Sequence, residues 1–337
     1  MKNKDHITIA HGSGGVLSRE LLDEYVFAAF SNPYIDQKHD GAVVPVDGQL
    51  VISTDSFVID PIFFKGGDIG ELSVNGTVND VAMCGGIPAY LSLSFIIEEG
   101  LALADLKKII CSIRKAAERA GVQIVTGDTK VVEKGKGDKI FINTTGVGTL
   151  HLKADIRLQR VRPGDRIVIN APVAAHGMAI MSQREGLTFE SDIVSDTQNL
   201  NKMVEVMLDR FGEEIHLLRD ATRGGLAGVL NEVAEDRNIG IHINEEAVPI
   251  DSQVAAACEL LGIDPLYVAN EGVFMAVVSE SVAKEVVELL RKEFHQTESG
   301  VIGECTESHT GKVVLNSHLG GKRFIYPQIG EQLPRIC

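Results

Sequence analysis

Strand-like apolar runs alternate with amphipathic helical patterns along most of the chain, and this alternation limits the possible folds more than any other feature. Residues 69–84 and Ala104–Ala120 carry apolar side chains at helical spacing. Tyr90–Ile97 and Ile140–Leu150 are typical of strands. Helices and strands interleaved in this way predict the α+β class.

Shorter runs complete the first half of the chain. Ala42–Val46 and Leu50–Thr54 flank Asp47-Gly48, which predicts a hairpin whose second strand ends in Thr54-Asp55-Ser56-Phe57. Val122–Thr126 predicts a short strand that ends in Gly127-Asp128-Thr129-Lys130. Lys134-Gly135-Lys136-Gly137 predicts a turn.

The alternation starts again after a turn-rich stretch, Arg160–Asp165, which predicts a domain boundary. We expect a leading segment over residues 1–40, one domain over 41–155, a second over 156–327 and a mobile tail over 328–337. The second domain should contain helices near 175–185, 197–211, 225–237, 251–261 and 281–294, and strands near 166–170, 215–219, 239–244, 273–278, 299–304, 312–315 and 322–326.

Composition and charge exclude several classes of function. The net charge of −15, from 47 acidic and 32 basic residues, argues against a nucleic-acid binder. Apolar runs such as Phe95-Ile96-Ile97 are too short to span a membrane, and the start of the chain does not resemble a signal peptide. The five cysteines are scattered without Cys-x-x-Cys, which favours a reducing, cytoplasmic location. Four of them, Cys84, Cys111, Cys258 and Cys305, are expected to be small buried side chains.

The fifth cysteine is the last residue. Glu331–Cys337 is polar and without periodicity, and Pro334 cannot continue a helix, so the Cys337 thiol should sit on a short mobile arm. Such a thiol can enter a site, react as the thiolate and leave. The alternative is a ragged tail whose last residue happens to be cysteine.

Four aspartates share an expected position, at the end of a strand or the mouth of a helix and beside small residues. They are Asp55, Asp80, Asp128 and Asp220. Oxygen ligands spread over several loops suit Mg²⁺ that is shared with substrate phosphates. Each aspartate taken singly is also explained as a turn or N-cap residue.

Other candidates are a glycine-rich turn and two charged residues. His11-Gly12-Ser13-Gly14-Gly15 opens a helix and presents backbone N–H groups that suit phosphate, or it is a plain helix-entry turn. Lys130 is placed to hold a phosphate or a developing anion, or it is a solvated lysine. Glu271, between Asn270 and Gly272, is a candidate general base or an ordinary loop acid.

Taken together, these motifs resemble a known family along essentially the whole chain. They are His11–Gly15, Ser53–Phe57, Asn79–Met83, Gly127–Lys130, Arg219–Gly225, Asn270–Gly272 and the ending Pro334-Arg335-Ile336-Cys337. They are similar to those of the HypE family of hydrogenase maturation proteins, and the ending is the most specific of them. The interior aspartate motifs are shared with aminoimidazole ribonucleotide synthetase, selenophosphate synthetase and thiamine-monophosphate kinase, so they indicate only ATP and Mg²⁺.

The resemblance implies a fold and a set of partners. It implies two α/β domains of PurM-like architecture, with the N-terminal domains of a homodimer joined in a β-barrel. It implies that the carbamoyltransferase HypF places a carboxamide on Cys337, and that ATP-dependent dehydration turns this group into a thiocyanate. The cyanide would then pass to iron on a HypC–HypD complex, for [NiFe]-hydrogenase.

The same resemblance implies roles for individual residues. Asp55, Asp80, Asp128 and Asp220 would bind Mg²⁺, and Glu271 or Lys130 would take the amide proton. The residues implied in ATP binding are His11, Gly12, Ser13, Gly14, Gly15, Asn79, Thr129, Asp220, Thr222, Arg223 and Asn270. Two alternatives stay open: another ATP-dependent enzyme of this superfamily, or a non-catalytic scaffold whose tail thiol binds a metal.

Overall fold

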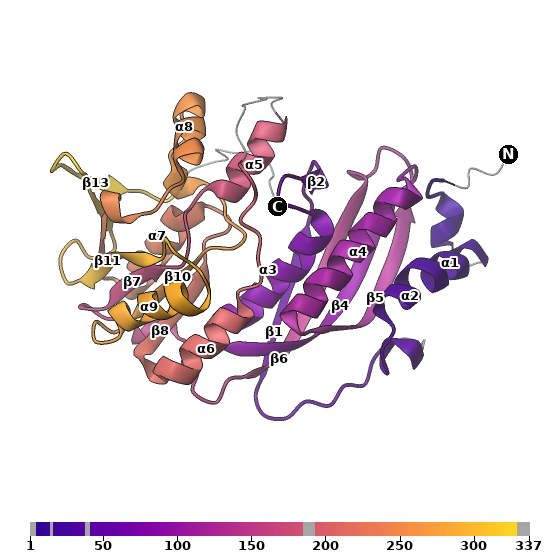
Figure 1. The fold of residues 1–337 in the computed structure, drawn as a ribbon, viewed down its shortest axis with the longest axis horizontal. Helices are drawn as coiled ribbons and strands as arrows, with labels where there is room; N and C mark the ends of the chain where they lie inside the picture. Colours follow the sequence, from indigo (N-terminus) through magenta and orange to yellow (C-terminus); the bar gives the residue numbers. More distant parts are fainter. Residues whose placement is uncertain (1–4, 14–15, 38–40, 185–192, 329–337) are drawn as a thin grey trace. The chain divides into compact units, whose positions relative to one another are not determined.

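The computed structural model describes residues 5–13, 16–37, 41–184 and 193–328, which form two compact units (Figure 1). One unit consists of the residues up to Val81 together with Gly86–Leu150, and the other of Ala82–Gly85 together with the described residues from His151 onward. Gly14, Gly15 and the expected arm with Cys337 lie outside the described residues. No helix within the described ranges combines the length and the hydropathy needed to cross a membrane.

The first unit is built on a four-stranded sheet of order β1-β6-β4-β5. Its strands are β1 (Leu50–Phe57), β4 (Gly86–Glu98), β5 (Gln123–Val132) and β6 (Ile140–Leu150). β6 pairs antiparallel with both β1 and β4, and β4 pairs parallel with β5. A short ladder of β2 (Phe63–Phe64) and β3 (Gly67–Asp68) leads into α3 (Ile69–Met83).

The hairpin predicted at residues 42–54 is wrong, because only its second run forms a strand. β1 pairs with β6 from Leu50↔Thr149 to Phe57↔Ile142, and residues 42–46 belong to no strand. Pro45 cannot donate a backbone hydrogen bond to a ladder, which explains why that run stays irregular. The β5 strand also continues through Gly127–Lys130 instead of ending there.

Two helices, α3 and α4 (Leu103–Ala120), cover one face of this sheet (Figure 1). Exposure alternates along β6, so that Thr144 faces the helices and shares a 2.6 Å hydrogen bond with Thr77 of α3. Gly70 allows α3 to cross α4 closely, since a Cβ there would lie 2.5 Å from the Ile109 carbonyl oxygen. The N-terminal segment adds α1 (Val16–Leu21), a π-helical turn (Leu22–Phe27) and α2 (Ala28–Phe30).

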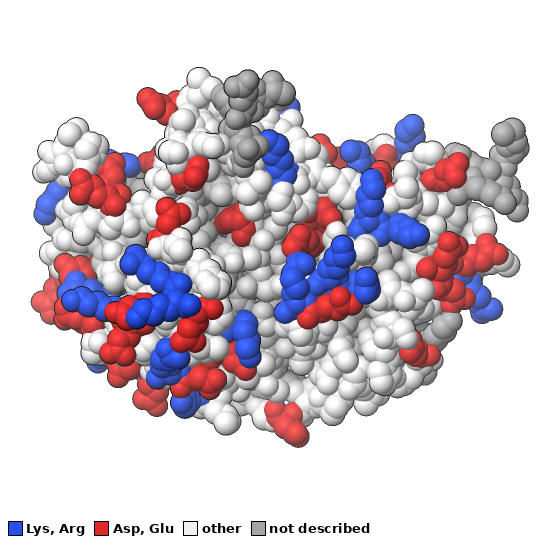
Figure 2. Space-filling model, viewed as in Figure 1, with Lys and Arg blue, Asp and Glu red and all other residues white. Residues whose placement is uncertain are grey.

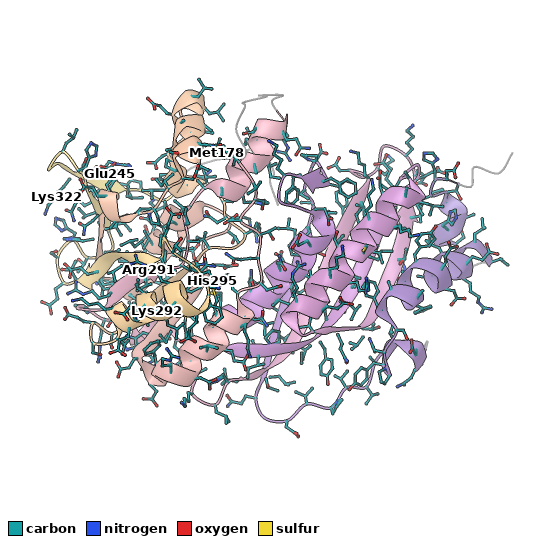
Figure 3. All side chains as sticks on the ribbon, viewed as in Figure 1. Met178, Glu245, Arg291, Lys292, His295 and Lys322 are labelled. Atoms are coloured by element: carbon teal, nitrogen blue, oxygen red, sulfur yellow. The ribbon has the colours of Figure 1, made fainter. Side chains whose placement is uncertain are left out.

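The second unit contains a seven-stranded sheet of order β13-β12-β9-β11-β7-β10-β8. Its strands are β7 (Arg166–Ile169), β8 (Ile215–Asp220), β9 (Gly240–Asn244), β10 (Phe274–Val278), β11 (Gly300–Thr306), β12 (Val313–Asn316) and β13 (Lys322–Ile325). Its helices are α5 (Ala175–Arg184), α6 (Asn201–Phe211), α7 (Gly225–Arg237), α8 (Ser252–Leu261) and α9 (Ala283–Glu293). Arg291 and Lys292 lie in the last turn of α9 (Figure 3), where cations stabilise a helix.

Both faces of this larger sheet are buried. Ile167 and Ile169 of β7 pack into one apolar cluster with α7, while Val168 between them packs into another cluster with α6 and α9. This is the alternation expected of strands with helices on both faces. Together the two units confirm the predicted α+β class.

The described cysteines only partly fit the prediction of buried thiols. Cys258 and Cys305 are buried, and burial raises the pKa of these thiols to about 11 and about 12. The prediction was wrong for Cys111, which is half-buried, and for Cys84, which is exposed. Cys84 lies one residue beyond the end of α3, in a turn that leaves its side chain exposed to solvent.

Candidate functional site

The first group of predicted site residues lies where the N-terminal loop rests on β5. Gly12 packs so closely on this strand that a Cβ on it would lie 2.8 Å from the backbone nitrogen of Val131. Nδ1 of His11 accepts a hydrogen bond from the Thr8 backbone N–H at 3.0 Å and lies 2.9 Å from the Thr8 hydroxyl. Ser13 is held by a 3.0 Å hydrogen bond from its hydroxyl to the Ile9 carbonyl. The structure thus brings part of the glycine-rich turn onto the strand of Asp128, Thr129 and Lys130.

Asp128 and Lys130 form an exposed ion pair on β5. The Lys130 ammonium lies 2.6 Å from Oδ2 of Asp128, and the Thr129 backbone N–H donates to Oδ1 at 2.8 Å. The hydrogen bond from Lys130 is the main reason why the pKa of Asp128 lies below its usual range. The Asp128 carboxylate is therefore ionised at neutral pH and offers oxygen ligands to a cation.

A cavity of about 130 Å³ opens beside these residues. Its lining residues come from the N-terminal segment and from β4 and β5: Val26, Phe27, Tyr34, Ile35, Gly41, Leu93, Phe95, Ile124, Val125, Thr126, Gly127, Asp128 and Thr129. Gly127 lies against β4, where a Cβ would come within 1.9 Å of the Leu93 carbonyl oxygen. The cavity therefore joins an apolar wall to the polar Asp128-Thr129 edge.

The second group lies between β1 and α3. Ser53 donates a 2.8 Å hydrogen bond to the Asp80 carboxylate, and Asp55 shares a strand face with Ser53. An Asp55 oxygen lies 3.9 Å from the position that a Cβ on Gly76 would occupy. Gly76 and Asp80 are four residues apart on α3 and so share one side of the helix. Asn79 is buried beside them on the same helix. The structure therefore brings Asp55 and Asp80 to the same seam.

The first two groups lie on different edges and faces of one sheet. Asp55 pairs with Thr144 of β6, whose side chain faces the helices. Asp128 pairs with Ser94 of β4, which in turn pairs with the residue before Thr144 on β6. Because successive residues of a strand face opposite sides of the sheet, Asp128 faces away from the helices. β1 and β5 are three strand spacings apart, about 14 Å, whereas Mg²⁺ needs its ligands within about 2.1 Å. Within the described residues, no three His, Cys, Asp or Glu side chains are grouped closely enough to hold a metal. Asp55 and Asp128 of one copy therefore cannot bind the same ion directly.

These positions also correct the expectation that all four aspartates lie at the end of a strand or the mouth of a helix. Asp80 lies inside α3, in its last turn. Asp55 and Asp128 lie inside β1 and β5, because the pairing with β6 and β4 continues beyond them. Only Asp220 is the last residue of its strand, β8.

The third group belongs to the second unit, where Asp220 leads into the loop with Thr222 and Arg223. The Thr222 carbonyl accepts a 2.9 Å hydrogen bond from Gly225, the first residue of α7. A Cβ on Gly225 would lie 2.6 Å from the carbonyl oxygens of Leu266 and Val268, so the helix begins on glycine.

Asn270 ties this loop to the Glu271 segment. Its buried side chain donates to the Ala221 carbonyl at 2.7 Å and accepts from the Ala174 backbone N–H at 2.6 Å. Glu271 follows directly and is itself buried. The structure thus brings the Asp220 loop and the Glu271 segment together through Asn270.

Sequence reasoning missed a set of polar residues around Glu271. The Asp196 carboxylate accepts the backbone N–H of Glu271 at 3.2 Å and of Gly272 at 3.3 Å. The Gly272 carbonyl accepts from Asn170 at 3.0 Å and from Gln198 at 2.9 Å. The only signal was the polar run Ser195–Asn199, which the sequence analysis assigned partly to a helix that in fact begins at Asn201.

Comparison with known proteins identifies the family. The N-terminal and C-terminal domain models of AIR synthase related proteins match residues 38–150 and 162–316. A carbamoyl dehydratase HypE from Bradyrhizobium diazoefficiens is 46% identical over 98% of this chain and 96% of its own length. The chain belongs to the HypE family. This confirms the resemblance carried by the motifs, and with it the expected pair of PurM-like domains.

Solved HypE structures share the fold. A hydrogenase maturation protein HypE in complex with ATP is 45% identical, with a TM-score of 0.94 over 98% of this chain and 99% of that chain. The HypE of a HypE–HypF complex is 43% identical, with a TM-score of 0.81 over 93% of this chain and 100% of that chain.

Proposed function

We propose that this chain is an ATP-dependent carbamoyl dehydratase, which converts a carboxamide on the Cys337 thiol into a thiocyanate. The cyanide would become a ligand of the iron of [NiFe]-hydrogenase. The main structural support is the packing of Gly12 on β5, the strand that carries Asp128 and Lys130. This packing brings the backbone of the glycine-rich turn onto the same strand as a carboxylate and an ammonium group. The HypE relative solved in complex with ATP supports the choice of nucleotide.

The triphosphate and the base of ATP would use neighbouring surfaces of the first unit. Backbone N–H groups of the glycine-rich turn would cover the phosphates, and Lys130 would neutralise part of their charge. The cavity lined by Phe27, Tyr34 and Val125 offers apolar and aromatic contacts for an adenine ring. Thr126–Thr129 at its edge would join the base to the phosphate region.

Mg²⁺ would be bound by oxygen atoms of Asp55, Asp80, Asp128 and Asp220, which is the ligand chemistry that this ion prefers. Bound there, it would neutralise the phosphates and align the γ-phosphoryl group. The distance between β1 and β5 requires that Asp128 come from a second copy if it binds the same ion as Asp55.

A homodimer through the open face of the four-stranded sheet would meet this requirement. That face exposes Leu50, Ile52 and Ile96, which are 51%, 62% and 44% accessible. Two such sheets closing into one barrel would pair their edge strands, and closure removes exposed edges. If β5 of one copy joins β1 of the other, Asp128 comes onto the strand next to that of Asp55.

The reaction needs an activated oxygen and a base. Phosphorylation of the amide oxygen by ATP creates a phosphate leaving group, and removal of both amide protons with loss of phosphate leaves S–C≡N. Glu271 or Lys130 would take a proton, and the other would stabilise the intermediate. A mobile tail would bring the carboxamide to the nucleotide as a tethered reactant.

The proposed partners follow the reaction. HypF would install the carboxamide, as the HypE–HypF complex of a relative suggests. A HypC–HypD complex would accept the cyanide, and the whole sequence would take place in the cytoplasm. No role for nucleic acid or membrane is proposed.

The test is whether ATP hydrolysis depends on a carbamoylated Cys337. Cyanate carbamoylates thiols, so the assay needs a Cys84→Ser background, because Cys84 is exposed as well. We expect one ATP consumed for each carbamoylated Cys337, and none in Cys337→Ala. Hydrolysis independent of Cys337 would favour another enzyme of the superfamily, and an absence of hydrolysis would favour a thiol scaffold.

A further inference from the structure

The Asp196 carboxylate has an unusual set of partners, because they are backbone N–H groups from two separate segments. It accepts from Glu271 and Gly272, at 3.2 and 3.3 Å, and from His176 at the start of α5. Burial raises the pKa of this carboxyl to about 6, against the lowering effect of these hydrogen bonds. Enclosing a carboxylate among neutral groups is unfavourable, so the ionised form of Asp196 destabilises the folded state.

The main chain on both sides of Glu271 is held by side chains. Asn270 is fixed by its hydrogen bonds to Ala174 and Ala221. The Gly272 carbonyl accepts from both Asn170 and Gln198. Gly272 also lies against the Asp196 backbone, since a Cβ there would come within 1.9 Å of the Asp196 carbonyl oxygen. Asp196 completes this arrangement by binding the N–H group of Glu271 itself.

Asp196 is in turn fixed by its neighbours. The Ser195 hydroxyl accepts from the Thr197 backbone N–H at 3.2 Å and lies 2.8 Å from Nδ1 of the buried His176. His176 belongs to α5, and Met178 on the same helix (Figure 3) is buried in an apolar cluster with α8. The carboxylate therefore reaches Glu271 from a segment attached to a packed helix.

We propose that Asp196 is the positioning residue for Glu271, holding its backbone so that its carboxylate meets the amide proton of the substrate. This inference rests on the proposed function and takes Glu271, of the two candidates Glu271 and Lys130, as the group that handles that proton. Misplacing a reacting group by about 1 Å can cost roughly 100-fold in rate. Asp196 does not touch the substrate and acts only through Glu271.

The experiment measures single-turnover conversion of the carbamoylated protein at several ATP concentrations. Asp196→Ala should slow the conversion about 100-fold at saturating ATP and leave the half-saturating ATP concentration within about twofold. Asp196→Asn, which keeps one oxygen acceptor, should recover part of the rate. Glu288→Ala, at an exposed acid of the same unit, should convert at the wild-type rate.

A double variant separates positioning from general stabilisation. If Asp196 acts through Glu271, then Glu271→Gln with Asp196→Ala should be no slower than Glu271→Gln alone. The inference would be overturned if the rate losses of the two single variants multiplied in the double variant, or if Asp196→Ala converted at the wild-type rate. Should Asp196→Ala fail to fold, the same comparison with Asp196→Asn decides. Loss of conversion in the wild type would contradict the proposed function itself, whereas an active Asp196→Ala beside an inactive Glu271→Gln would contradict only this inference.

Discussion

At the scale of single residues, the same side-chain type serves different purposes according to its surroundings. Asp128 is exposed and paired with Lys130, so its pKa is lowered and its ionised carboxylate is accessible to a cation. Asp196 is buried, which raises its pKa to about 6, and its hydrogen bonds from backbone N–H groups hold the loop of Glu271. The sequence suggested the first role, because Asp128 follows an apolar run beside a lysine. It could not suggest the second, because Glu271 and Gly272, which donate to Asp196, are about 75 residues away along the chain.

The raised pKa of Asp196 predicts a pH-dependent stability. The folded state binds this proton more tightly than the unfolded state, so the contribution to folding is complete below about pH 4 and is lost as the pH rises through about 6. Over that range the wild type should lose about 2 to 3 kcal/mol that Asp196→Asn does not lose. Urea unfolding of both proteins between pH 4 and pH 7 measures this difference. If the free energies of unfolding of the two proteins changed in parallel with pH, this prediction would be contradicted.

Asp80 allows a second test at this scale. Asp80→Asn removes a charge at the seam with Ser53 and should lower Mg²⁺-dependent turnover about 100-fold or more, with the protein still folded. The control is Asp105→Asn, which changes an acid in the first turn of α4 that forms an ion pair with Lys108. Unchanged turnover in Asp80→Asn would remove Asp80 from the proposed ligands.

At the scale of elements, β5 contributes most to the proposed phosphate site, because it carries Asp128 and Lys130 and supports the Gly12 loop. The sequence predicted β6 to the residue and α3 to within one residue, since apolar periodicity and flanking glycines mark their ends. It ended β5 too early, because Gly127 looks like a turn residue. The structure uses Gly127 instead for its lack of a side chain, in a strand that passes close to Leu93.

A glycine substitution tests this account of β5. In Gly127→Ala the new methyl group would lie 1.9 Å from the Leu93 carbonyl, so the free energy of unfolding should fall by about 3 kcal/mol. Gly137→Ala is the matched control, since its nearest neighbour would be 3.6 Å away, and it should change stability by less than about 0.5 kcal/mol. Equal thermal unfolding of the two variants would show that β5 tolerates a side chain at this position.

At the scale of the whole molecule, the distribution of charge and of apolar surface matters most. Figure 2 shows basic and acidic side chains interspersed on the face viewed, and the net charge of the chain is −15. The exposed apolar residues on the open sheet face are the surface that the proposed homodimer would cover. The alternation of elements was enough to predict two α+β domains. It could not predict that Asp55 and Asp128 lie on opposite edges of one sheet, because strand order depends on long-range pairing.

Mixing two inactive variants tests whether the site is shared between copies. If Asp80 comes from one copy and Asp128 from the other, an Asp80→Asn/Asp128→Asn heterodimer contains one intact site. Random exchange of the two homodimers should then restore about a quarter of wild-type turnover. If both residues served a site within one copy, every site would carry a defect and no activity would return.

The central claim is that the Cys337 thiol carries the substrate, and intact-mass spectrometry of the carbamoylated Cys84→Ser protein tests it most directly. With ATP and Mg²⁺, the carbamoylated species should lose the mass of one water molecule as the carboxamide becomes a thiocyanate, and without ATP its mass should not change. A carbamoyl adduct that persists in the presence of ATP, or the same loss of water in Cys337→Ala, would contradict the account.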